Sequence, residues 1–305
     1  MLNNLYHLTK RKIYFLTLIV TLFLALGFLF ACQPDRALND TGTEVDNTVE
    51  SPQDEPDSTD EPEEPVEPDP PPPSPLPVFG IYAGAGSWLE NVEAISNFLD
   101  HYGYEWYQFD AEEAATSEPA DLYDVIWFPG GFAAEYKHYI GDHENIRSFV
   151  HQGGTFIGSC AGAYYASAVL RWSGTAYDYP LSLFEGEAVG PMSGLIGWGS
   201  QAEISPEAGH PVSENFPEKI EMCYCDGPYF KADQNGQDLV VLARYIVNDK
   251  PAVVAVPFGS GKALLLGPHP ELSRYDPSSA GFDLEGGEGS QWPWLHEAIL
   301  WLIDW

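Results

Sequence analysis

Basic residues are scarce in this chain of 305 residues, which carries 13 Lys and Arg side chains against 46 Asp and Glu side chains. The formal net charge of −33 argues against nucleic acid and anionic lipid surfaces as partners, because both repel an acidic protein. A saline habitat and a cationic ligand would each account for this acidity, and the sequence does not distinguish them.

Cysteine is also scarce, with four in the whole chain, and no nucleotide or metal signature accompanies them. The glycine-rich loop 84–86 lacks the third glycine and the ribose-binding acid of a dinucleotide site, and no phosphate-binding lysine motif occurs. Cys223 and Cys225 would face the same side of a strand, but no further ligand stands at metal spacing. We interpret both as small core residues, since a disulfide between them would be strained. We therefore predict neither a cofactor nor a metal.

The N-terminus has the pattern of a secretory signal, with a basic cluster and then a long apolar run over residues 10–30. We expect a signal peptide over residues 1–31. Its end, Ala31-Cys32, resembles the lipobox of bacterial lipoproteins, which implies cleavage after Ala31 and lipidation of Cys32. The alternative is a retained transmembrane anchor, because the run could just span a bilayer. Either reading places the folded part in the cell envelope outside the cytoplasmic membrane, and Gln33 favours the outer membrane if the organism is Gram-negative.

Residues 32–77 are rich in Asp, Glu and Pro and nearly free of aromatic side chains. Such a segment cannot bury enough apolar surface to fold, and its charges and prolines keep it extended. We expect a disordered tether that holds the domain off the membrane, with an acidic partner-binding tail as the alternative. The remaining residues, 78–305, fit a single α/β domain.

Strand-like and helix-like segments alternate in this domain, as in a doubly wound, flavodoxin-like fold with a mostly parallel sheet. Many glycines and aromatics between residues 172 and 236 predict a small antiparallel β insertion. We expect strands at 78–82, 106–109, 125–128, 155–157 and 263–266, and helices at 88–102, 111–115, 146–151, 163–170 and 292–305.

Residues 158–162, Gly-Ser-Cys-Ala-Gly, lie between an expected strand and an expected helix, which is the cysteine version of a nucleophile elbow. The flanking glycines are needed because side chains there would collide across the tight turn. The following helix N-terminus favours a thiolate at Cys160 and leaves backbone amides free for an oxyanion. The alternative for these five residues alone is a buried cysteine beside a glycine-rich turn.

Two further motifs end expected strands. Pro-Gly-Gly at 129–131 follows the strand 125–128, and Gly-Pro-His-Pro-Glu at 267–271 follows the strand 263–266. A histidine with a carboxylate two residues later supplies a base and the group that fixes its tautomer. Since open α/β sheets place their sites at the carboxyl ends of strands, we expect the two motifs and the elbow at one edge.

In this order, the Pro-Gly-Gly turn, the elbow and the His-Pro-Glu motif resemble class I glutamine amidotransferases. More narrowly, residues 80–86, 158–165 and 267–271 resemble the domain at the N-terminus of eukaryotic biotin–protein ligases, which also occurs alone in bacteria. The resemblance runs from about residue 78 to residue 305.

This resemblance implies that Cys160 is the nucleophile, His269 the general base and acid, and Glu271 the carboxylate that orients it. It also implies that the amides of Gly131 and Ala161 form the oxyanion hole.

Three further residues are expected to contact substrate. Gly130 lies in the Pro-Gly-Gly turn, and Asp226 and Tyr229 lie in a region that faces the catalytic edge in this family.

The resemblance leaves two functions open. One is an extracytoplasmic cysteine hydrolase acting on an amide or ester of a small molecule or peptide, and the other is a non-catalytic ligand-binding module with the same fold. We expect no synthetase domain and no biotin ligase catalytic region, so the resemblance does not imply ammonia delivery to a second site. The sequence does not indicate the oligomeric state.

Overall fold

The computed structural model describes residues 76–305, except residues 117, 234–236 and 288. The expected signal peptide, Cys32 and all but the last two residues of the expected tether lie outside the described residues. Among the residues described, no helix is both long and apolar enough to cross a membrane.

The main sheet has nine strands in the order β2-β1-β3-β4-β13-β12-β11-β8-β9. The first five are mutually parallel, and their order is that of a flavodoxin-like, doubly wound sheet, which confirms the predicted fold class. The other four pair antiparallel. The bounds are β1 Val78–Tyr82, β2 Glu105–Phe109, β3 Val125–Phe128, β4 Thr155–Ser159, β13 Gly261–Leu266, β12 Lys250–Phe258, β11 Val240–Tyr245, β8 Ser200–Pro206 and β9 Ile220–Tyr224.

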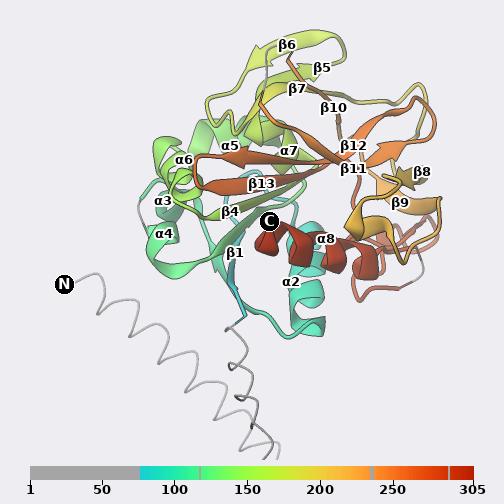
Figure 1. Cartoon of the computed structure of the whole chain (residues 1–305), viewed down its shortest axis with the longest axis horizontal. Coiled ribbons are helices and arrows are strands. Elements are labelled where there is room, and N and C mark those ends of the chain that lie inside the picture. Colours follow the sequence, from blue (N-terminus) through green and yellow to red (C-terminus); the bar gives the residue numbers. More distant parts are fainter. Residues whose placement is uncertain (1–75, 117, 234–236, 288) are drawn as a thin grey trace, which may run out of the picture. The chain divides into compact units, whose positions relative to one another are not determined.

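Helices cover both faces of the parallel strands (Figure 1). Side chains alternate along a strand, so in β3 Val125 and Trp127 enter one core and Ile126 and Phe128 enter the other. Helices α2 (Leu89–His101) and α8 (Trp292–Asp304) close the first core, and α5 (Ala133–Tyr139), α6 (Glu144–His151) and α7 (Ala161–Ala166) close the second. The short helices α3 (Ala111–Ala114) and α4 (Glu118–Leu122) precede β3.

The region predicted as an antiparallel insertion, residues 172–236, contributes to both sheets, because its strands β8 and β9 join the main sheet. Its other strands belong to a second sheet of four strands in the order β10-β7-β5-β6. Two of its pairings are antiparallel, as expected, but β5 and β7 run parallel. Its strands are β5 Ser167–Trp172, β6 Thr175–Asp178, β7 Phe184–Gly190 and β10 Tyr229–Lys231. Figure 1 shows this second sheet above the main one. The remaining elements are the 3₁₀ turn η1 (Pro211–Ser213) and a hairpin of β14 (Tyr275–Asp276) and β15 (Gly281–Phe282).

The helix after the elbow is shorter than predicted. We expected helix over residues 163–170, but α7 ends at Ala166 and residues 167–172 form β5. The chain turns at Ser167, whose hydroxyl donates to the carbonyl of Ala163 and whose backbone is extended. A short apolar run fits helix and buried strand equally well, and here pairing with β6 and β7 decides for strand.

The elbow itself has the predicted geometry. Cys160 has a φ of 47°, which is strained for a residue with a side chain. A Cβ on Gly158 would lie 2.6 Å from the backbone carbon of Gly162, and a Cβ on Gly162 would collide with the carbonyl oxygen of Phe128. Both glycines are therefore steric requirements of the turn, as expected.

We predict that Gly162→Ala lowers the free energy of unfolding by about 3 kcal/mol or more, because the added methyl group meets backbone that cannot move aside. Urea unfolding followed by tryptophan fluorescence measures this change. Gly194→Ala is the control, because a Cβ there meets nothing within 4 Å, and its effect should stay within about 1 kcal/mol. Equal stability of the two variants would contradict the steric explanation.

Candidate active site

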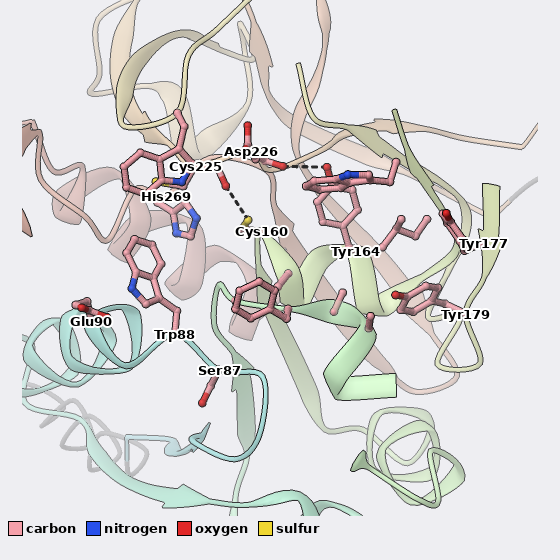
Figure 2. Close-up of a pocket in the computed structure, with 18 of the residues that line it drawn as sticks. Ser87, Trp88, Glu90, Cys160, Tyr164, Tyr177, Tyr179, Cys225, Asp226 and His269 are labelled. Carbon is pink, nitrogen blue, oxygen red and sulfur yellow. Dashed lines mark hydrogen bonds between the residues drawn. The ribbon is translucent and has the colours of Figure 1, made fainter. Parts of the chain in front are cut away.

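Three strand ends meet at one edge of the sheet. β4 is central and leads directly into Cys160, while β3 leads into the Pro-Gly-Gly turn on one side and β13 leads to His269 on the other. The strands are in register, with Phe128 of β3 opposite Gly158 and Leu266 of β13 opposite Ser159. The predicted convergence of the three motifs is therefore observed, and Figure 2 shows Cys160 and His269 side by side.

His269 and Glu271 form a fully buried pair. The imidazole Nδ1 donates to Glu271 Oε1 at 2.8 Å, and both side chains are inaccessible to solvent. Burial by itself would lower the pKa of His269, but the Glu271 carboxylate and Cys160 raise this pKa well above its usual value of 6.5. The pair therefore favours the protonated form of the His269 imidazole.

The Cys160 thiol makes a different hydrogen bond from the one expected. Its Sγ donates to the carbonyl oxygen of Cys225 at 3.3 Å. His269 Nε2, the nitrogen available to the thiol, is buried and has no hydrogen-bond partner among the described residues. The expected separation of about 4 Å between the sulfur and an imidazole nitrogen stays a prediction.

Two backbone amides beside the thiol are free to bind an oxyanion. Within the described part of the chain, neither the Gly131 nor the Ala161 N–H donates a hydrogen bond. Both residues line the same pocket as Cys160. The turn is held in place because Trp88 N donates to Gly130 O at 2.9 Å. The positions fit an oxyanion hole.

Asn91 is a buried residue of the site that the sequence analysis missed. Its Nδ2 donates to Glu271 Oε1 at 2.6 Å, and its Oδ1 accepts from the backbone N–H of Gly130 at 2.5 Å. Gly130 in turn lies against the His269 ring, where a Cβ would come within 2.7 Å of Cε1. Asn91 therefore ties the Pro-Gly-Gly turn to the buried pair. The sequence feature that could have indicated this role is a polar residue, Asn91, among the apolar residues of the buried face of α2.

Two tryptophans enclose the His269–Glu271 pair. The Trp88 ring meets the His269 ring edge to face, with centroids 6.0 Å apart, and Trp292 Nε1 donates to the Glu271 carbonyl at 2.9 Å. Apolar rings keep water away from the pair, which strengthens its electrostatic interaction.

A pocket of about 890 Å³ opens above Cys160. Asp226, one of the expected substrate contacts, lines the pocket. Gly130 is not among the lining residues and packs against the His269 ring. Tyr229 does not line the pocket but packs against the core that α2 and α8 cover, so its expected substrate contact is not supported. The lining residues are Ser87, Trp88, Leu89, Glu90, Gly131, Phe132, Ala133, Ala134, Cys160, Ala161, Tyr164, Leu170, Trp172, Tyr177, Tyr179, Trp198, Cys225, Asp226 and His269.

Cys223 and Cys225 are buried free thiols with their sulfur atoms 3.8 Å apart. Hydrogen bonding to Cys225 and burial raise the pKa of Cys223, while the hydrogen bond from Cys223 lowers the pKa of Cys225. Cys225 is more than core filling, because it also lines the pocket. The described residues contain no group of three or more His, Cys, Asp or Glu side chains placed to hold a metal ion.

The strand order and the cysteine elbow at the carboxyl edge define a class I glutamine amidotransferase-like fold. Within this class the chain belongs to the family described as "Biotin-protein ligase, N terminal", whose model matches residues 79–283.

Two proteins of known sequence and one of known structure are similar to this chain. Biotin–protein ligase of Schizosaccharomyces pombe is 27% identical over 163 residues, which are 49% of this chain and 26% of that enzyme. An uncharacterized protein of Chlamydia muridarum is 29% identical over 179 residues, which are 54% of this chain and 65% of that protein. The match thus spans less than two thirds of either relative. A glutamine amidotransferase from Thermotoga maritima has a TM-score of 0.49 at 13% identity, covering 75% of this chain and 99% of that one.

The raised pKa of His269 predicts a pH-dependent loss of stability in Glu271→Gln. A pKa raised by folding adds stability that is complete below about pH 6.5 and is lost as the pH rises through the folded value. We therefore expect Glu271→Gln to lower the free energy of unfolding by about 3 kcal/mol near pH 6 and by clearly less near pH 9.

Urea unfolding at the two pH values measures this difference. Glu221→Gln is the control, because Glu221 pairs with Arg274 at the surface, where a loss of about 1 kcal/mol or less is expected. A loss for Glu271→Gln that does not change with pH would contradict the charged pair.

Proposed function

We propose that this domain is an extracytoplasmic cysteine hydrolase that cleaves an amide or ester of a small molecule or peptide. The supporting observation is that three features meet at one pocket: a thiol on a strained backbone, the imidazole of the buried His269–Glu271 pair, and two free amides. Each is a group that acyl transfer through a thioester requires.

In the proposed reaction the Cys160 thiolate attacks the substrate carbonyl carbon, and the resulting oxyanion is held by the amides of Gly131 and Ala161. His269 gives its proton to the leaving nitrogen or oxygen as that bond breaks. A water molecule then attacks the thioester, His269 accepts its proton, and the carboxylic acid leaves. Glu271 keeps the imidazole oriented and stabilises its charge throughout.

A non-catalytic ligand-binding module is the second candidate, and one observation favours it. The Cys160 thiol bonds to the Cys225 carbonyl, and His269 Nε2 has no partner among the described residues. A thiol that donates to a backbone carbonyl is not donating to the imidazole beside it. Hydrolysis requires the thiol to give up this bond and to transfer its proton to His269.

The reactivity of Cys160 discriminates the two candidates. We expect His269→Ala to slow alkylation of Cys160 by iodoacetamide near neutral pH by about tenfold or more, because the imidazolium stabilises the thiolate. It should also abolish the burst of p-nitrophenol from p-nitrophenyl acetate that an acyl-enzyme produces. Peptide mass spectrometry follows the alkylation of each cysteine.

His138→Ala is the matched control, because His138 is exposed on α5 and outside the pocket. It should alkylate at the wild-type rate. Equal rates for the wild type and His269→Ala, together with no burst, would leave the binding module as the better proposal.

We also propose that the domain is anchored in the cell envelope through a lipid on Cys32. The support is the basic cluster, the apolar run and the small residue before Cys32. The acidic, proline-rich segment that follows would then act as the tether.

Substituting Cys32→Ser should leave an uncleaved precursor and abolish incorporation of labelled fatty acid. Gel mobility and radiolabelled palmitate measure the two effects, and Cys223→Ser serves as the control that keeps the label. Persistent labelling of Cys32→Ser would contradict the lipid anchor.

A further inference from the structure

We propose that the pocket beside Cys160 selects amides that carry both a large apolar group and a positively charged amino group. This assignment rests on the proposed hydrolase function and names the substrate class of the same site. It follows from the aromatic walls of the pocket and from the charges among its lining residues.

The pocket gathers a large share of the exposed apolar side chains of the described surface. Five of the twelve large hydrophobic side chains that are exposed in the described residues line it, although it is one small part of the surface. They are Leu89, Phe132, Trp172, Tyr177 and Trp198. Exposed apolar side chains that cluster at a cavity mark a ligand site, because leaving them in water is unfavourable.

Aromatic residues that line the pocket lie on both sides of the nucleophile. Figure 2 shows Cys160 and Tyr164 between Trp88 on one side and Tyr177 and Tyr179 on the other. The Tyr164 ring is also backed by Trp172 of β5, with ring centroids 5.7 Å apart. An acyl group held at Cys160 would therefore extend along rings that the second sheet supplies, and aromatic walls favour a large apolar or aromatic group.

The charges in the pocket are acidic apart from His269. Among the described lining residues there is no Lys or Arg, whereas Glu90 and Asp226 are present. The charge of His269 is already paired with Glu271, so an anionic substituent would mainly meet the like charges of Glu90 and Asp226, and the pocket disfavours carboxylates and phosphates.

Asp226 supplies the specific receptor for an amino group. Its Oδ1 is buried and has no hydrogen-bond partner among the described residues, and its backbone carbonyl already accepts from Tyr164. Burial also raises the pKa of this carboxyl. A buried oxygen without a donor is costly, and a rotation of the half-buried Asp226 side chain on binding would let an ammonium group of a ligand remove that cost with a charge-assisted bond.

Protection of Cys160 from iodoacetamide by small amides tests this assignment in the full-length protein. The probes are L-phenylalaninamide, L-alaninamide, N-acetyl-L-phenylalaninamide and N-succinyl-L-phenylalaninamide. We expect L-phenylalaninamide to protect at about tenfold lower concentration than the alanine or the N-acetyl compound, since each lacks one of the two recognised groups. The anionic N-succinyl compound should protect least.

Two pairs of matched variants connect the selectivity to the pocket. Trp172→Ala should reduce the preference for phenylalanine over alanine by about threefold or more, whereas Trp305→Ala, a tryptophan of similar exposure outside the pocket, should not. Asp226→Asn should remove the preference for the free amino group. Asp249→Asn is its control, because Asp249 has nearly the same positive φ (57° against 59°) but lies outside the pocket.

The outcomes separate this assignment from the proposed hydrolase. Protection does not require turnover, so the pattern above with no release of ammonia would keep the substrate class and reject hydrolysis. Release of ammonia without preference among the four amides would support hydrolysis and reject the substrate class. Equal protection by all four probes, best protection by the anionic one, or control variants that behave like Trp172→Ala and Asp226→Asn would overturn the assignment.

Discussion

The buried hydrogen bond between His269 and Glu271 is the interaction on which the site depends. Two ionisable groups are taken fully out of water there, and each is tolerable only because the other compensates it. Asn91 extends the pair to the backbone of Gly130. Helix α2, the turn after β3 and the end of β13 are thus fixed to one another around a single carboxylate. A displacement of any one of them would leave a buried charge or a buried donor without a partner.

The sequence was sufficient where the determinant is local. The elbow could be predicted because the two glycines around Cys160 are required by sterics within five residues. The shared edge followed from the ends of three parallel strands. What the sequence did not provide depends on contacts across the fold. Asn91 became part of the site only because the fold brings α2 to Glu271, 180 residues along the chain. Residues 167–172 became strand through pairing with β6 and β7, and the acceptor of the Cys160 thiol is a carbonyl 65 residues away.

The two sheets divide the work of the site. The parallel strands place the groups that would carry the chemistry, and their positions follow from the strand order. The wall of the pocket comes from the segment inserted between α7 and β12, which supplies Trp172, Tyr177 and Asp226. Trp172 and Tyr177 belong to the second sheet or its connections, so changes there can alter what is bound without disturbing the thiol or the His269–Glu271 pair. Asp226 differs, because it follows β9 of the main sheet, where the Cys223 carbonyl accepts from the backbone N–H of His269.

The turn at Cys225 and Asp226 joins these two parts. The carbonyl of Cys225 accepts the hydrogen bond of the Cys160 thiol, and the next residue carries the unpaired buried carboxylate oxygen. Asp226 has a positive φ, which aspartate tolerates better than most residues and which the tight turn after β9 requires. Under the proposals above, a ligand that pairs with Asp226 would bind against the same turn that accepts the hydrogen bond of the thiol. Occupancy of the pocket and release of the thiol to the imidazole would then be coupled through two adjacent residues.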